Sequence, residues 1–116
     1  MKYLCLIYED EQQMLKRSGE ASAMSPDYIA FTEGIQKSGH YLGGNALQPT
    51  HTATTVRSRG GKVSTTDGPF AETKEQLGGY YLIEGKDLND AIQVAGRIPS
   101  ARFGSIEVRP IMEFRK

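Results

Sequence analysis

Two short segments of this chain carry apolar side chains on both of the faces that a β-strand presents. Residues 3–8 (YLCLIY) and 80–83 (YYLI) contain no charged residue, whereas a strand with one solvated face alternates apolar and polar positions. A sheet that contains such strands needs a cover on each of its two sides. This requirement limits the folds open to the chain more than any other feature of the sequence.

Two helices are predicted between the strands. Residues 25–27 (SPD) are typical of a helix start, because serine caps, proline fits the first helical position and an acid favours the first turn. Gly39 predicts the end of this helix. A second helix is expected to begin after its cap, Asp87, and to end at Pro99. The apolar stripes that the helices would bury are Tyr28, Phe31 and Ile35 in the first and Leu88, Ala91, Ile92, Ala95 and Ile98 in the second.

The other strands come from weaker patterns. Gly60 and Gly61 lie between two segments rich in threonine, valine and serine, which predicts a β-hairpin. Pro110 cannot donate a hydrogen bond to a neighbour, so the last strand is expected at an edge of the sheet or beside a gap in pairing, with Ile106, Val108 and Met112 on one face. The remaining expectations are strands at residues 41–47, 53–58, 62–66 and 105–112, and a loop at 9–24 with one helical turn near 12–16.

The order of these elements, β-α-β-hairpin-β-α-β, is typical of the split βαβ or ferredoxin-like fold. We therefore expect one α+β domain over residues 1–116, with both helices on one face of the sheet and an inserted hairpin. The other face would be bare although its side chains are apolar, which is unfavourable in water. The sequence thus predicts a homodimer in which two sheets pack face to face as a dimeric α/β-barrel, with a cleft between sheet and helices.

Composition narrows the classes of function. Fourteen Lys and Arg balance fourteen Asp and Glu, so no basic face is expected for nucleic acid. The apolar run at the start is too short for a membrane span or a signal peptide, which favours a cytoplasmic protein without a membrane partner. Cys5 is the single cysteine, and His40 and His51 have no third ligand at a recognisable spacing. We therefore expect no metal and no cofactor.

The segment from Thr66 to Glu75 is the most unusual part of the sequence. Asp67 is a carboxylate at a Gly-Pro turn and, with Glu72 nearby, could act as a general acid or base. Alternatively, Asp67 accepts hydrogen bonds from the backbone of the turn and Phe70 fills the core. Tyrosine hydroxyls in a cleft can also orient a ligand oxygen, and the candidates for such a role are Tyr28 and Tyr81.

These residues resemble a known family. The motif at 67–70 (DGPF), followed by 72–75 (ETKE) and 78–81 (GGYY), is similar to the DGPF-motif branch of the YCII-related family, and the likeness extends from the strand at 1–8 to residues 107–110 (EVRP). The resemblance implies a ferredoxin-like dimeric α/β-barrel. It also implies either a cofactor-independent lyase or isomerase for small molecules, or a non-catalytic ligand-binding or regulatory module associated with an extracytoplasmic-function sigma factor.

The resemblance also bears on the site residues. YCII-like proteins are proposed to use a His–Asp pair, and the matching positions in this sequence hold Tyr28 and Ile98. The acid or base role then falls to Asp67 with Glu72 as its helper, while Tyr28 and Tyr81 are the expected substrate-binding residues.

Overall fold

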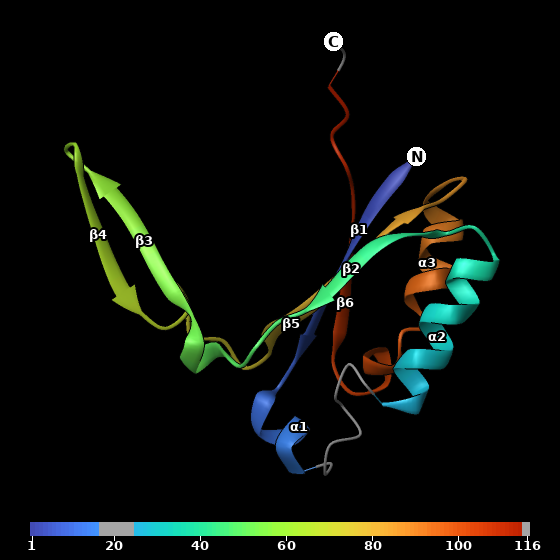
Figure 1. The fold of residues 1–116 in the computed structure, drawn as a ribbon, viewed down its shortest axis with the longest axis horizontal. Helices are drawn as coiled ribbons and strands as arrows, with labels where there is room; N and C mark the ends of the chain where they lie inside the picture. Colours follow the sequence, from blue (N-terminus) through green and yellow to red (C-terminus); the bar gives the residue numbers. More distant parts are fainter. Residues whose placement is uncertain (17–24, 115–116) are drawn as a thin grey trace.

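The computed structural model describes residues 1–16 and 25–114 of the chain (Figure 1). Half of the loop predicted at residues 9–24, namely residues 17–24, therefore lies outside the described residues. In the other half, Glu9 ends a strand and the predicted helical turn forms a short helix. The elements in chain order are β1 (Lys2–Glu9), α1 (Glu11–Lys16), α2 (Pro26–Lys37), β2 (Tyr41–Ala46), η1 (Thr50–Thr52), β3 (Thr54–Arg59), β4 (Lys62–Asp67), β5 (Gln76–Glu84), α3 (Leu88–Ala95), η2 (Pro99–Arg102) and β6 (Ser105–Pro110).

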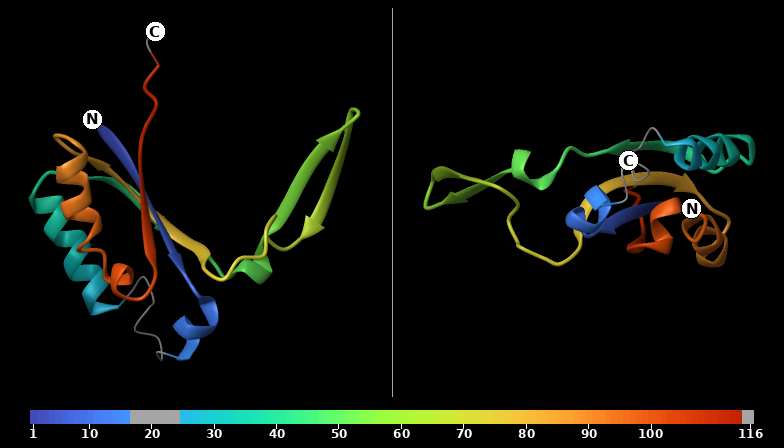
Figure 2. Two further views of the ribbon diagram at one scale, coloured as in Figure 1. Left: turned by 180° about the vertical axis from the view of Figure 1, so that it is seen from behind. Right: turned by 90° about the horizontal axis from the view of Figure 1, so that it is seen from below.

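The strands form two antiparallel sheets. Four of them make a sheet in the order β2-β5-β1-β6, in which β1 pairs with both β5 and β6. Strands β3 and β4 pair with each other as a separate two-stranded sheet, which projects away from the larger sheet (Figures 1 and 2). The chain is thus an α+β fold, and its strand order is compatible with the ferredoxin-like fold. Because β6 lies at an edge of the sheet, the missing backbone N–H of Pro110 interrupts no hydrogen bond within the sheet.

The hydrophobic core lies between the sheet and helices α2 and α3. Alternate residues of β1 are buried, which places one face of the strand against the helices and leaves the other face partly exposed. The buried apolar residues are Tyr3, Cys5 and Ile7 of β1, Tyr28 and Ile35 of α2, Ile83 of β5, Ala91, Val94 and Ala95 of α3, and Ile98.

Local signals set the start of each helix as predicted. The hydroxyl of Ser25 accepts a hydrogen bond from the backbone of Tyr28, and the Asp87 carboxylate accepts one from the backbone of Asp90. After α2 the chain reverses at Gly39, whose φ of 81° favours glycine. His40 then follows, and its Nε2 lies 3.1 Å from Asp90 Oδ1. This pair ties the end of α2 to the first turn of α3, and hydrogen bonds from the Lys86 backbone and from His40 lower the pKa of Asp90.

The structure corrects three sequence predictions in the last third of the chain. In α3, Val94 is buried while Leu88 and Ile92 are exposed, because the stripe that meets the sheet is rotated by about one residue. The helix also ends at Ala95, and Pro99 begins the turn η2 instead of ending α3.

The last strand is shorter than predicted. Met112 lies beyond the end of β6 and is exposed. The ladder stops at Pro110 because its partner, Tyr3, is already next to the first residue of β1.

The pKa of the single thiol gives a test of the core. Cys5 is fully buried, and burial raises the pKa of its thiol from 9.0 to about 11. A group whose pKa is raised on folding contributes stability below its ordinary pKa, and this contribution is lost as the pH rises through the higher value. We expect the free energy of unfolding of the wild type to fall by roughly 2 kcal/mol relative to Cys5→Ala between pH 8 and pH 11.

Urea unfolding of both proteins at the two pH values measures this difference. Because the cavity left by Cys5→Ala is the same at each pH, it cancels. An unchanged difference between the two proteins would contradict a protonated, buried thiol.

Candidate functional site

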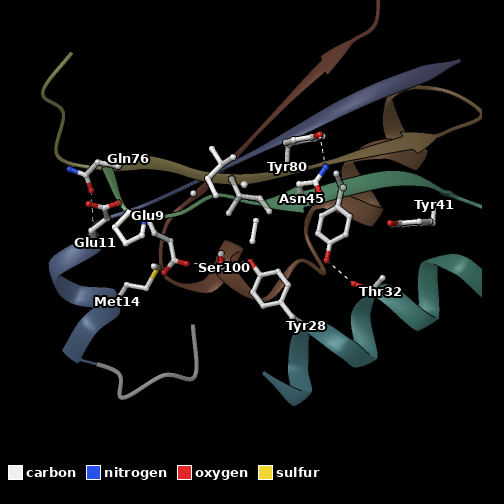
Figure 3. Close-up of a pocket in the computed structure, with 18 residues that line it drawn as sticks. Glu9, Glu11, Met14, Tyr28, Thr32, Tyr41, Asn45, Gln76, Tyr80 and Ser100 are labelled. Carbon is white, nitrogen blue, oxygen red and sulfur yellow. Dashed lines mark hydrogen bonds between the residues drawn. The ribbon is translucent and has the colours of Figure 1, made fainter. Parts of the chain in front are cut away.

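A cavity of about 320 Å³ lies among the sheet, α1, α2 and the turn η2 (Figure 3). Its wall combines aromatic rings with polar groups that come from distant parts of the chain. The side chains with hydroxyl, amide or carboxyl groups are Glu9 of β1, Glu11 of α1, Tyr28 and Thr32 of α2, Tyr41 and Asn45 of β2, Gln76, Tyr80 and Tyr81 of β5, and Ser100 of η2.

Three of these residues form a buried chain of hydrogen bonds. The hydroxyl of Ser100 donates to Glu9 Oε2 at 2.6 Å, and the hydroxyls of Ser100 and Tyr28 also form a hydrogen bond (Figure 3). Because the one proton of Ser100 points to the carboxylate, Tyr28 must donate to Ser100. Glu9, Ser100 and Tyr28 are only 5%, 3% and 8% exposed. These hydrogen bonds therefore hold the Glu9 carboxylate at the wall of the cavity, and most water is kept away from that carboxylate.

The positions of these groups follow from the local fold. Glu9 is the last residue of β1 and faces the helices, since it continues the alternation of Tyr3, Cys5 and Ile7. Tyr28 lies in the first turn of α2, which the Ser25 cap fixes. Ser100 is carried by η2, which begins at the proline after α3.

Gly104 allows the segment that follows η2 to approach β1. A Cβ atom at Gly104 would lie 2.0 Å from the carbonyl oxygen of Tyr8 and 2.9 Å from Cγ of Glu9. Such contacts are far inside van der Waals distance, so only glycine lets the segment after η2 pass this close to the end of β1. The short bond between Ser100 and Glu9 depends on the same approach.

Two tyrosines of the cavity, the buried Tyr28 and the partly buried Tyr81, favour their protonated forms. Burial is the main cause that raises the pKa of Tyr28, and the nearby charge of Glu9 adds to it, while the hydrogen bond with Ser100 opposes it. Burial also raises the pKa of Tyr81, whose hydroxyl lies 2.7 Å from the Thr32 hydroxyl. Both phenols are therefore hydrogen-bond donors at neutral pH, not bases.

The structure brings together two of the four site residues predicted from the sequence. Tyr28 and Tyr81 both line the cavity. Asp67, the last residue of β4, and Glu72 are exposed to solvent and do not line it. The alternative prediction that Phe70 fills the core is wrong, because its side chain is 81% exposed. The glycine of the motif lies at a bend, where its φ of 98° favours glycine.

Sequence reasoning missed Glu9 and Ser100. Glu9 falls on the core-facing side of β1 by simple alternation, but the acidic run at residues 9–11 (EDE) favours the start of a loop. Ser100 lies two residues after Ile98, the position that matches the family aspartate. Ile98 itself packs in the core, whereas Ser100 reaches the cavity.

Two other features are absent from residues 1–16 and 25–114. No group of three or more His, Cys, Asp and Glu side chains in these ranges is placed to hold a metal ion. No helix in them is long and apolar enough to cross a membrane.

Comparison with known proteins places the chain in a family. The model of the YCII-related domain matches residues 1–115. A protein of Rhizobium meliloti (strain 1021), described as uncharacterised, is 36% identical over 118 residues, which cover 99% of this chain and 95% of that protein. The chain belongs to the YCII-related family, as its resemblance to that family suggested.

Two serines provide a matched test of the buried chain. Ser100 and Ser105 each donate a hydrogen bond to a glutamate, Ser100 to Glu9 inside the cavity wall and Ser105 to Glu75 at the surface. Ser100→Ala removes the hydroxyl that bonds both Glu9 and Tyr28. We therefore expect this substitution to lower the free energy of unfolding by about 1–3 kcal/mol. Ser105→Ala should change it by less than about 0.5 kcal/mol.

Chemical unfolding of the three proteins measures both changes. Equal effects of the two substitutions would show that the bond between Ser100 and Glu9 is no stronger than one at the surface.

Proposed function

We propose that this protein is a cofactor-independent enzyme of the lyase or isomerase type, which acts on a small polar molecule in the cavity. The observation that carries the proposal is the carboxylate of Glu9 in the cavity wall, hydrogen-bonded through Ser100 to Tyr28. A carboxylate that is held in the wall of a cavity by a hydrogen bond is positioned to take a proton from a molecule bound there. The cavity volume, about 320 Å³, suits a small organic substrate.

The residues present can complete a proton transfer. Glu9 takes a proton from a carbon next to a carbonyl group, and the electrons of the broken C–H bond move into the carbonyl oxygen. Tyr81 can donate a hydrogen bond to this oxygen when Thr32 donates to Tyr81. Glu9 then returns the proton to a different carbon in an isomerase, or the electrons expel a leaving group from the neighbouring carbon in a lyase.

This proposal gives the base role to Glu9, whereas the sequence motif gives it to Asp67. The two assignments predict opposite results for Glu9→Gln and Asp67→Asn, which each replace a carboxylate by an amide of the same shape. We expect Glu9→Gln to reduce turnover by about 100-fold or more and Asp67→Asn to leave it nearly unchanged.

The measurement is the consumption of compounds from a mixture of metabolites, followed by mass spectrometry. Melting temperatures of both variants are the control for folding. Loss of turnover in a folded Asp67→Asn protein, with Glu9→Gln active, would return the role to the motif.

The second candidate is a non-catalytic ligand-binding or regulatory module that acts with an extracytoplasmic-function sigma factor in the cytoplasm. It is favoured by the resemblance to the DGPF-motif branch and by tyrosines at the cavity that can bind a ligand without reacting. A stable complex with a candidate sigma factor on co-expression, together with no consumption of any metabolite, would support this function and contradict the enzyme.

We also propose that the protein is a homodimer. On the sheet face away from the helices, apolar side chains are only partly covered within one chain, among them Leu4 and Leu6 of β1 and Leu82 of β5. A second sheet packed on this face would remove them from water, a gain of roughly 25 cal/mol for each Å² of apolar surface.

Sedimentation velocity at micromolar concentration tests the dimer. We expect the wild type to sediment as a dimer and Leu6→Asp, on the uncovered face, to shift toward monomer. Ile29→Asp is the matched control, because Ile29 is an exposed apolar residue of α2 on the other side of the molecule. A monomeric wild type would refute the proposed assembly.

A further inference from the structure

The molecule exposes more surface than a compact monomer of its size. Its accessible surface is 8331 Å², whereas a folded monomer of this mass exposes about 6,300 Å². Its radius of gyration is 15.9 Å against about 13 Å for a compact chain of this length. The surplus of about 2,000 Å² per chain is of the order that obligate homodimers bury.

The hairpin formed by β3 and β4, which we name the arm (residues 54–67), is exposed along almost its whole length. Every residue of β4 is exposed, as are all residues of β3 except Thr55. The arm extends from the rest of the molecule in each view of Figure 2. A two-stranded hairpin alone is at best marginally stable in water, so the arm needs a surface to pack on.

The pairing of the strands gives the arm two different faces. Residues that face each other across an antiparallel pair lie on the same side. Val56 therefore shares a face with Thr65, and Val63 shares it with Ser58. The opposite face carries Arg57 beside Ser64 and Arg59 beside Lys62.

The valine face is the one suited to a protein contact. Val56 and Val63 are 62% and 71% exposed, although valines at strand positions are normally covered. The cations on the opposite face favour water.

A second exposed apolar surface lies where the arm joins the rest of the molecule. A groove of about 750 Å³ at the root of the arm is lined by Leu47, Pro49, Pro69, Phe70 and Leu77 among others. The exposed ring of Phe70 belongs to this groove. The valine face, the groove and the uncovered face of the sheet therefore make three apolar surfaces on one chain.

We propose that the arm is a dimerisation element whose valine face packs against a second copy of this chain. A second copy is favoured because a two-fold pair covers the arm and the sheet of both chains in one self-complementary interface. The formal net charge of zero means that two copies do not repel each other. This inference rests on the homodimer proposed above and adds the arm as a part of its interface that the packing of sheets alone does not require.

The first test uses two pairs of substitutions on opposite faces of the arm. Val56→Asp with Val63→Asp places carboxylates on the valine face, and Ser64→Asp with Thr66→Asp places the same number on the cationic face. In sedimentation velocity of the full chain, we expect the first pair to raise the dimer dissociation constant by about 100-fold or more. The second pair should leave a dimer like the wild type.

The second test remains valid if the aspartate variants fail to fold. Cys5 is buried with a pKa of about 11, so it does not compete with an introduced cysteine for maleimide. In the wild-type background, Val63→Cys should be labelled about tenfold more slowly than its neighbour on the opposite face, Ser64→Cys. At a dilution that dissociates the dimer, the two rates should become equal.

The outcomes separate the arm from the dimer itself. A dimer in which both cysteines react at the same rate, or which the valine substitutions do not weaken while folded, would overturn the role of the arm and leave the packing of the sheets standing. A wild-type monomer at micromolar concentration would overturn both.

Discussion

The alternation of side chains along β1 is the constraint on which the rest of the structure depends. One face of this strand carries Tyr3, Cys5 and Ile7 into the core beneath the helices. The same two-residue period carries the next residue, Glu9, to the same side. The strand that contributes to the core thus also places a carboxylate at the wall of the cavity. The alternation alone is enough to direct this side chain inward.

A carboxylate in this position needs compensation, because loss of water around a charge is costly. Ser100 supplies a hydrogen bond, and Tyr28 supports Ser100 in turn. Each partner depends on another element, since the first turn of α2 positions Tyr28 and η2 positions Ser100. The cavity and the core are therefore parts of one arrangement, in which helix capping and sheet packing decide the positions of the polar groups.

Helix starts and turns, which depend on neighbouring residues, could be predicted from the sequence, whereas the side chains that meet across distant contacts could be predicted only in part. The cap of α2 and the turn at Gly60-Gly61 are local, and the structure confirms both. In α3, two overlapping apolar stripes share Ala91 and Ala95, and only packing against the sheet selects the one with Val94. The bond between Glu9 and Ser100 joins residues 91 positions apart, so no local pattern reveals it.

Gly104 shows that chemistry can depend on a missing side chain. The distance between the end of β1 and the segment after η2 is set at a position that has no atoms beyond the backbone. Even a methyl group would force the two segments apart by more than a hydrogen bond tolerates. A residue that carries no functional group, and that does not border the cavity, therefore acts as the spacer that keeps hydroxyl and carboxylate within reach of each other. Comparisons of relatives restricted to reactive side chains would overlook it.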